Sequence, residues 1–212
     1  MYQPRQFRED DPQVLRAFIA RHPLGTLVAS TAEGLTANHV PMFWRAQGAT
    51  PGILAGHIAK ANTLWQRLAP DEAVMVVFLG ANHYITPSWY PAKRVDGRVV
   101  PTWNYSVVHA HGTIRFFRDP EAALEKVRGL TELQESGRQA PWAVSDAPAD
   151  YLQAMLRQIV PFEITLARLQ GKFKASQHRP AEERAAVTAA LHAEGLDEQS
   201  VGELVRSPPL PP

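Results

Sequence analysis

The stretch of residues 84–112 constrains the fold of this chain most strongly. It concentrates aromatic rings, prolines and hydrogen-bonding side chains, whereas an ordinary core strand is rich in Val, Ile and Leu. Pro87, Pro91 and Pro101 fix the backbone angle φ and interrupt long elements, so the aromatic residues must lie on short, stiff segments. Rigid rings interleaved with donors suit a planar ligand with polar edges. An aromatic-rich corner of a β-sheet core is the alternative interpretation.

The residues that follow these aromatic side chains alternate strictly between two kinds of side chain. Residues 108, 110, 112, 114 and 116 are small or apolar, whereas 109, 111, 113 and 115 are polar. This period of two predicts a β-strand with one buried face. Running the same register backwards places Trp103 and Tyr105 on the side of the histidines. We therefore expect the apolar face to change sides near Ser106, through a bulge or a strand that leaves a site.

Hydrophobic periodicity and turn residues predict the other elements. Further strands are expected at residues 24–30, 35–44, 53–58, 74–79 and 162–166, the fourth of them buried on both faces and followed by a turn at Gly80 and Asn82. Helices are expected from Pro12 to before Pro23 and at residues 63–68, 119–135, 150–158, 181–193 and 198–205. In the helix at 150–158, the inward side chains are predicted to be Tyr151, Leu152, Met155 and Leu156. About seven strands with surrounding helices predict an α+β domain built on an antiparallel sheet or barrel.

Composition limits the classes of protein to which the chain can belong. With 212 residues, 45% of them hydrophobic and 20% charged, it suits one large domain, or a domain with an appendage, around a sizeable core. A net charge of +1 gives no overall attraction for nucleic acid, and the lack of cysteine excludes disulfides and thiolate metal sites. The N-terminus does not have the pattern of a signal peptide, and no apolar run reaches the roughly 18 residues of a membrane span. A cytoplasmic protein without membrane contact is expected.

The segment of residues 55–62 is a candidate phosphate site. It follows a predicted strand, precedes a predicted helix and contains Lys60. Unpaired N–H groups at a helix start, beside a lysine, can bind a phosphate. The segment lacks the GxxxxGK[ST] pattern of a Walker loop, and a solvated lysine is the more common situation at a helix start.

Three further groups of polar residues are candidates for ligand binding. Asn38 and His39 interrupt a strand and suit either the edge of a heterocycle or a satisfied, partly buried histidine. His109 and His111 share a strand face without a closely spaced carboxylate, which favours solvent or interface positions over a metal site. Residues 170–180 form a dense donor cluster, suited to a phosphate clamp or a solvated strand end. No catalytic triad, nucleophile elbow or carboxylate pair indicates a hydrolase, so no catalytic residue is assigned.

Several of these motifs, in fixed order to about residue 191, resemble the PaiB family, described as FMN-binding negative transcriptional regulators. The similarity rests on residues 22–25, 37–41, 56–62, 84–90, 100–105, 109–112 and 171–177. It implies an α+β split β-barrel like those of pyridoxamine-phosphate-oxidase-type flavoproteins. This FMN-binding domain with helical decorations would span residues 1–194, and residues 195–212 would form a short helix and a flexible Pro-rich tail.

The same resemblance implies that FMN is bound at the interface of a homodimer. In such barrels a strand-to-helix segment with a lysine holds the phosphate, which corresponds to residues 57–62. Residues 38–41 would lie along the isoalloxazine ring or the ribityl chain, and residues from the C-terminal half would close the site, from the same or the second subunit. The predicted FMN-binding residues are Asn38, His39, Val40, Pro41, His57, Ile58, Ala59, Lys60, Asn62, Trp103, Asn104, Tyr105, Lys172, Lys174 and Gln177.

Two functional classes remain open at this point. FMN can be the sensed ligand of a regulator, or the cofactor of an FMN-dependent oxidoreductase that acts on a small molecule. Heme binding is a third and weaker hypothesis, with His39, His57, His109 or His111 as the iron ligand. Because no helix-turn-helix pattern is visible, any direct contact with DNA is expected to be weak and steeply salt-dependent.

Overall fold

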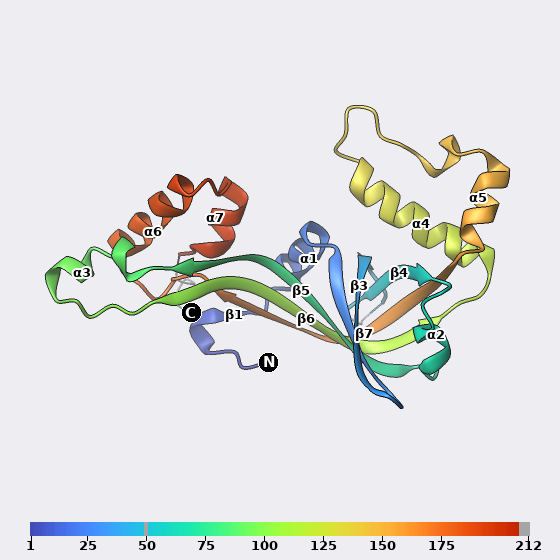
Figure 1. The fold of residues 1–212 in the computed structure, drawn as a ribbon, viewed down its shortest axis with the longest axis horizontal. Helices are drawn as coiled ribbons and strands as arrows, with labels where there is room; N and C mark the ends of the chain where they lie inside the picture. Colours follow the sequence, from blue (N-terminus) through green and yellow to red (C-terminus); the bar gives the residue numbers. More distant parts are fainter. Residues whose placement is uncertain (49–50, 208–212) are drawn as a thin grey trace. The chain divides into compact units, whose positions relative to one another are not determined.

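The computed structural model describes residues 1–48 and 51–207 of the chain (Figure 1). Most of the Pro-rich tail predicted at the C-terminus, residues 208–212, lies outside the described residues. Within them, the predicted mixture of antiparallel strands and helices is confirmed, and the chain is an α+β protein.

Every predicted strand and helix is present. The strands are β1 (Arg8–Glu9), β2 (Leu24–Thr31), β3 (Gly34–Arg45), β4 (Ile53–Ala59), β5 (Glu72–Ile85), β6 (Thr102–Phe116) and β7 (Ile159–Lys174). The helices are α1 (Pro12–Arg21), α2 (Leu64–Arg67), α3 (Ala92–Val95), α4 (Pro120–Glu135), α5 (Ala149–Leu156), α6 (Ala181–Ala193) and α7 (Glu198–Leu204), and short 3-10 turns lie at Arg5–Phe7, Pro87–Trp89 and Val144–Asp146. Strands β5, β6 and β7 extend well beyond the apolar runs that predicted them.

The seven strands form one sheet in the described part of the chain. Their order is β1-β7-β4-β3-β2-β5-β6, and an additional pairing joins β7 to β6. Gly112 lies at a close approach of these two strands, because a Cβ atom there would come within 2.2 Å of the carbonyl oxygen of Thr165. A sheet that pairs back on itself in this way is a barrel topology.

By its contacts the chain divides into two compact units. The first unit comprises Met1–Asp11, Leu79–Val108 and the described residues from Gln170 onwards. The second unit comprises Pro12–Phe78 and His109–Leu169. In the first unit, α6 and α7 pack side by side (Figure 1), and α7 contributes Val201 and Leu204 to a buried cluster with Ile85, Tyr90 and Val187.

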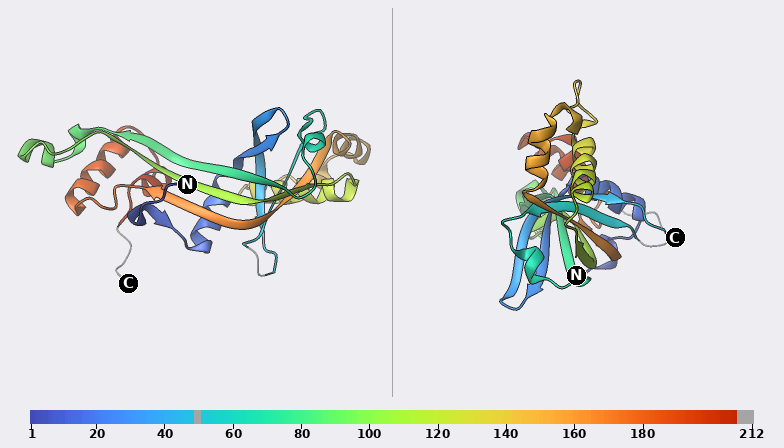
Figure 2. Two further views of the ribbon diagram at one scale, coloured as in Figure 1. Left: turned by 90° about the horizontal axis from the view of Figure 1, so that it is seen from below. Right: turned by 90° about the vertical axis from the view of Figure 1, so that its right-hand side faces the viewer.

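In the second unit, β2 and β3 form a hairpin (Figure 2), with Thr26 opposite His39 and Leu27 opposite Asn38. β2 also pairs with β5, whereas β4 pairs with β3 and with β7. Helix α4 packs against β3 and β4. Gly129 permits this approach, because a Cβ atom there would lie 2.4 Å from the ring of Phe43.

A buried charge also holds α4 in place, and the sequence did not reveal it. The side chain of Lys126 is 2% exposed. Its ammonium group forms ion pairs of 2.7 Å with Glu125 and 2.6 Å with Glu163 on β7. The guanidinium of Arg45 on β3 contacts the same two carboxylates. Since charged groups are seldom fully buried unless they are paired, this ring of charges fixes α4 relative to β3 and β7.

The predicted turn at Gly80 and Asn82 is wrong, because β5 continues through both residues to Ile85. Buried side chains occupy even-numbered positions as far as Phe78, and the next fully buried side chain is the odd-numbered Ile85. At this change of side, the N–H of Ala81 donates to the carboxylate of Glu203 at 2.9 Å. Gly and Asn therefore mark an irregular point inside a strand and not its end.

The predicted change of side near Ser106 is also wrong. Asn104 and Ser106 are buried on the same side of β6 as Val108, and Trp103 is 54% exposed. The amide of Asn104 donates to Ser176 Oγ and to the carbonyl of Leu204, each at 2.8 Å. Hydrophobic patterning missed the buried face here because its residues are polar and are satisfied by hydrogen bonds.

Two burial predictions fail because parts of the surface are uncovered. On α5, Tyr151 and Met155 are exposed and only Leu156 is fully buried. On β5, Met75 and Val77 are only partly buried, so the strand is not buried on both faces as expected.

Candidate functional site

Three segments of the second unit surround a hollow of about 250 Å³. One segment contains Lys60, just after β4; another contains Arg118, just after β6; the third contains Arg157, just before β7. Backbone hydrogen bonds fix the segments to the start of β7, because the N–H of Lys60 donates to Gln158 at 2.7 Å and that of Phe117 donates to Pro161 at 2.9 Å. The pairing of strands thus brings three cations from distant parts of the sequence together.

The hollow is positively charged and has an aromatic wall. Asp119 also lines it, but the carboxylate of Asp119 accepts the N–H of Ala122 at 2.7 Å and so caps α4. The guanidinium of Arg118 lies 5.0 Å from the ring centre of Trp65. The Trp65 indole N–H donates to the carbonyl of Lys60 at 3.2 Å. Arginine and lysine side chains around a small hollow are the donors that bind phosphate well.

Three of the N–H groups around the start of α2 already have partners within the chain. The N–H of Lys60 is bonded to Gln158, that of Asn62 to Ala59, and that of Leu64 to the side chain of Asn62. Helix α2 is only four residues long, so its dipole is weak. The side chains of Lys60, Arg118 and Arg157 are the positive charges that line this hollow.

Asn38 and His39 are tied to neighbouring elements through their side chains. The side-chain oxygen of Asn38 accepts from the amide of Asn62 at 2.8 Å, which links β3 to the loop that follows Lys60. His39 Nδ1 lies 3.0 Å from the hydroxyl of Thr26 across the hairpin. The side chains of Val40 and Ile58 are buried in the core, so only their backbone is available to a ligand.

His57 on β4 carries a polar atom that lacks a partner. Its Nδ1 atom is buried and forms no hydrogen bond among the described residues. Burial lowers the pKa of His57 below its ordinary value, so the ring is neutral at neutral pH. Because buried polar atoms are nearly always hydrogen-bonded, this nitrogen is suited to a ligand that supplies the missing group.

The other six predicted residues lie in the first unit, and they differ in exposure. Trp103 is exposed, and its ring contacts that of Tyr84 edge-on, with 6.3 Å between the ring centres. The ammonium of Lys172 lies 5.3 Å from the ring centre of Tyr105. Lys174 donates to the carbonyl of Trp103 at 2.6 Å, and burial together with the charge of Lys172 lowers the pKa of Lys174.

Asn104 and Gln177 are buried, and their side chains bond to their own chain. The amide of Gln177 donates to the carbonyl of Phe173 at 2.6 Å, and its oxygen accepts the N–H of Ala175 at 2.8 Å. Both amide hydrogens of Asn104 are used within the first unit, as described above. These two residues therefore hold the first unit together.

Comparison with known proteins places the chain in a family. Residues 1–168 match the family described as "Putative FMN-binding domain". The chain belongs to this family. An uncharacterized protein of Aspergillus fumigatus is 32% identical over 93% of each chain. Protease synthase and sporulation protein PAI 2 of Bacillus subtilis is 30% identical over 84% of this chain and 83% of its own, which confirms the similarity to the PaiB proteins.

Solved structures confirm the fold. The FAD and heme binding protein from Mycobacterium smegmatis superposes with a TM-score of 0.57, and the match covers 79% of this chain and 73% of that chain. Sequence identity is only 13%, so this likeness concerns the fold alone. The architecture is the split β-barrel that the sequence predicted.

FMN is the cofactor of the family, and the residues of the second unit fit it. The three cations around the hollow match the charge of a phosphate. The unpartnered Nδ1 of His57 matches the polar edge of a flavin. FMN supplies redox chemistry when it is bound, whereas the protein binds and orients it.

Arg118, Arg157 and Trp65 were missed as site residues by sequence reasoning. None of them belongs to a local motif. Trp65 lies five residues after Lys60, whereas Arg118 and Arg157 meet Lys60 only through the pairing of β4, β6 and β7. The available signal was position, because Arg118 directly follows one predicted strand region and Arg157 precedes another. Basic residues at the ends of strands that adjoin a lysine loop are the pattern to search for.

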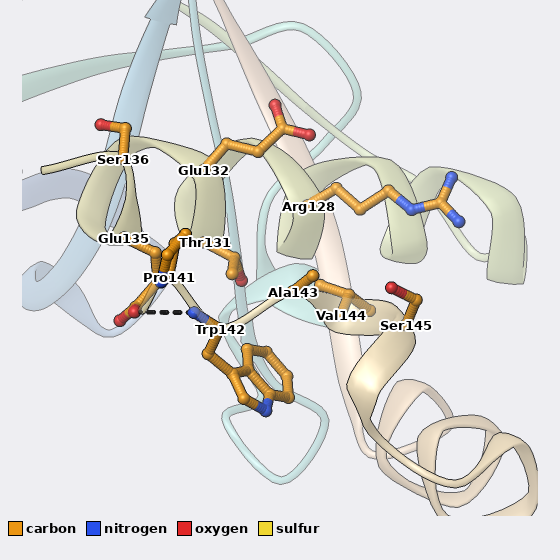
Figure 3. A pocket seen from close by; sticks show the side chains of 10 residues that line it. All are labelled: Arg128, Thr131, Glu132, Glu135, Ser136, Pro141, Trp142, Ala143, Val144 and Ser145. Carbon is orange, nitrogen blue, oxygen red and sulfur yellow. Dashed lines mark hydrogen bonds between the residues drawn. The ribbon is translucent and has the colours of Figure 1, made fainter. Parts of the chain in front are cut away.

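A separate hollow of about 360 Å³ lies between α4 and the chain that follows it (Figure 3). The N–H of Trp142 donates to the carboxylate of Glu135 at 3.1 Å, whereas the side chains of Arg128 and Glu132 extend away from the indole (Figure 3). No predicted FMN-binding residue lines this hollow. Trp142 also lines a neighbouring hollow of about 530 Å³, and Pro41 contributes to that one.

Residues 1–48 and 51–207 contain no group of three or more His, Cys, Asp or Glu side chains placed to hold a metal ion. The rings of His109 and His111 are 6.3 Å apart, and an Arg168 nitrogen lies 3.5 Å from His111 Nδ1. None of the helices in the described segments is long and apolar enough to cross a membrane.

Proposed function

We propose that this chain is an FMN-binding negative transcriptional regulator of the PaiB type, which acts as a homodimer and holds the FMN phosphate in the hollow of Lys60, Arg118 and Arg157. The observation that carries the FMN site is the convergence of these three cations. Among the described residues no carboxylate forms an ion pair with any of them, so their charge is available to a ligand. Arginine binds phosphate through two parallel hydrogen bonds, and lysine adds a point charge.

The flavin end of the site follows from the register of β3 and β4. The ladder between β3 and β4 ends with Met42 opposite Gly56, and the next residues of the two strands are Pro41 and His57. Asn38 lies beyond them towards Lys60, to which it is linked by Asn62. A ligand that runs from the hollow along this edge would contact Asn38 and then His57. The phosphate, the ribityl chain and the ring of FMN occur in that order.

The FMN proposal is tested by flavin titration of the purified protein. We expect a flavin absorbance spectrum, and FMN should bind at least about tenfold more tightly than riboflavin, which lacks the phosphate. Equal affinity for FMN and riboflavin would contradict the phosphate assignment. A Soret band in place of flavin bands would instead favour the heme hypothesis for the histidines.

The homodimer is supported by an uncovered apolar face in the second unit. Leu35 is 81% exposed and Leu24 is 60% exposed, and beside them Val28, Met75 and Val77 are only partly buried. Contiguous apolar surface of this kind usually marks an interface, and a second copy of the chain would cover it. Sedimentation should give about twice the monomer mass of 23.5 kDa. A monomer at micromolar concentration would contradict the proposal, and Val28→Glu should shift the mass towards the monomer.

Regulation is proposed to act through metabolism or a partner protein, with only weak direct contact with DNA. The chain carries 22 basic and 21 acidic residues, so it has little net attraction for phosphates. The test is a binding isotherm on a candidate operator and on a scrambled duplex at physiological salt. Weak binding to both that is lost when salt rises is expected, and tight binding that distinguishes the two would overturn this proposal.

A second candidate function is an FMN-dependent oxidoreductase, and the hollow shared by Trp142 and Pro41 favours it. This hollow of about 530 Å³ is lined mainly by apolar side chains and lies beside a predicted flavin residue. Such a space suits a small apolar substrate against the indole. The test is turnover of reduced nicotinamide cofactors with a panel of small acceptors. Turnover that falls in Trp142→Ala would support this function, and no turnover with any acceptor would contradict it.

A further inference from the structure

Strands β3 and β4 pair over only part of their length. Their ladder ends with Met42 opposite Gly56. Beyond that point β4 continues along β7, whereas β3 continues along β2. In the part of the chain that the structure describes, residues 38–41 of β3 therefore pair with β2 and not with β4. A side-chain hydrogen bond of 2.8 Å links the chain just after β4 to this part of β3, from Asn62 to Asn38.

The side-chain amide of Asn62 is hydrogen-bonded at both of its ends. Its oxygen accepts the backbone N–H of Leu64 at 3.1 Å, and its nitrogen donates to the oxygen of Asn38 at 2.8 Å. Because a backbone N–H group can only donate, it requires the oxygen of Asn62 on its side. The nitrogen of Asn62 must then face Asn38, and a nitrogen that donates requires the oxygen of Asn38 in return. The backbone of Leu64 thus fixes the orientation of both amides.

This arrangement leaves the nitrogen of Asn38 for a ligand. Asn38 is partly buried, and its Nδ2 atom forms no hydrogen bond with any other residue among 1–48 and 51–207. An amide nitrogen offers two donors and no acceptor. The proposed path of the flavin from Lys60 to His57 passes Asn38. The group that Asn38 can offer to the flavin there is therefore a hydrogen-bond donor.

We propose that Asn62 is a positioning residue, which holds the amide of Asn38 so that it donates a hydrogen bond to an oxygen atom of the flavin. This inference rests on the proposed function, because it requires the flavin to lie along β3. It gives Asn62 a role that acts through Asn38, in place of the direct contact with FMN that the family resemblance implies. Oxygen atoms of the ribityl chain and of the flavin ring can both accept such a bond.

The test compares riboflavin titrations of two Asn62 variants. Riboflavin is the probe because it lacks the phosphate, which an added negative charge would repel. Asn62→Asp keeps an acceptor for the N–H of Leu64 but offers no donor, so the amide of Asn38 should flip and present its oxygen to the flavin. Asn62→Ala removes both bonds and leaves Asn38 able to adopt either orientation. We expect riboflavin affinity to fall about fivefold in Asn62→Asp and about twofold in Asn62→Ala.

A purely structural role for Asn62 predicts the opposite order. Asn62→Ala leaves the N–H of Leu64 without its partner, whereas Asn62→Asp keeps that bond, so the apoprotein of Asn62→Ala should have the lower melting temperature. If riboflavin affinity follows the melting temperature, with Asn62→Ala the weaker binder, or if both variants lose affinity equally, the inference is overturned.

Gln66→Glu is the matched control for the added charge. Gln66 is exposed on α2, four residues after Asn62, and its side chain forms no hydrogen bond within the described residues. This variant makes the same change from amide to carboxylate and should leave riboflavin affinity unchanged. A loss as large as that of Asn62→Asp would show that charge alone explains the effect, and would overturn the inference.

A second variant keeps the test decisive if Asn62→Asp does not fold. In Asn38→Asp the new carboxylate still accepts from Asn62 but offers no donor to the flavin, so riboflavin affinity should fall about fivefold or more. Unchanged affinity overturns the inference and leaves the flavin site in place. If the wild type binds neither FMN nor riboflavin, the proposed function itself fails, and the inference fails with it.

Discussion

Two groups of polar residues, one in each unit, differ in whether their side chains already have hydrogen-bond or ion-pair partners within the chain. In the first unit, Asn104 and Gln177 are buried, and their amides donate to groups of their own chain. In the second unit, Lys60, Arg118 and Arg157 surround a hollow and form no ion pair with a carboxylate among the described residues. Satisfied buried amides specify a fold, whereas unpaired charges around a hollow attract a ligand. Lys60 and Asn104, which the same family resemblance singled out as FMN-binding residues, therefore have different physical tasks.

The largest expected effect is a loss of stability when one of the buried amides of the first unit is replaced. Asn104→Leu removes two donors and leaves the carbonyl of Leu204 and the hydroxyl of Ser176 without their partner. Unfolding free energy should fall by about 2–4 kcal/mol, since each buried group left unsatisfied costs roughly 1–3 kcal/mol. Urea unfolding of the apoprotein measures this change.

The control for this prediction is Thr113→Val, which alters an exposed residue of the same strand. It should change stability by less than about 0.5 kcal/mol. For the folded fraction of Asn104→Leu, the loss of FMN affinity should be smaller than the loss of stability. A stable variant that loses mainly FMN affinity would show that Asn104 belongs to the ligand-binding group, and would break the comparison.

The strands and helices could be predicted from the sequence better than which polar side chains are buried. Period-two alternation from Val108 to Phe116 predicted a strand correctly, because burial there is apolar. The same rule failed four residues earlier, where Asn104 is buried and Trp103 is exposed. Side-chain hydrogen bonds to residues far along the chain decide which face is buried there, and the local sequence does not indicate these partners.

The candidate phosphate site also shows that sequence reasoning misses partners that are distant in the chain. Lys60 was identified from its place between a strand and a helix, and the structure places it at a hollow. Of the N–H groups expected to assist it, those of Asn62 and Leu64 are used within the chain. The charges that complete the hollow come from Arg118 and Arg157, residues that only strand pairing brings to Lys60.

The second prediction removes a charge from the ligand-binding group. Lys60→Ala should weaken FMN binding by about 1.5–3 kcal/mol, the loss of one charge-assisted contact, and should leave riboflavin binding nearly unchanged. Paired flavin titrations measure both affinities. Lys93→Ala is a suitable control, because that ammonium bonds to Ser88 in the first unit at 2.8 Å and lines none of the hollows described above. FMN affinity that is the same in Lys60→Ala and in the wild type would remove the lysine from the site.

The smallest expected effect concerns His57, a buried polar group of the second unit that lacks a partner. Burial lowers its pKa in the folded chain below the value of about 6.5 expected in the unfolded chain. As pH falls through 6.5 towards the folded pKa, the unfolded state takes up a proton first, so the folded apoprotein loses stability. His109 and His178 have lowered pKa values for the same main reason, burial, so wild-type stability alone does not isolate His57. His57→Gln should therefore show a shallower fall in melting temperature than the wild type between pH 7.5 and about pH 5.5.

If a flavin supplies the missing hydrogen-bond donor to the neutral ring, the affinity of the wild type for FMN should also fall over this pH range, and it should fall by more than the affinity of His57→Gln. Identical pH profiles for the two proteins would show that the unpartnered nitrogen has no part in stability or in flavin binding.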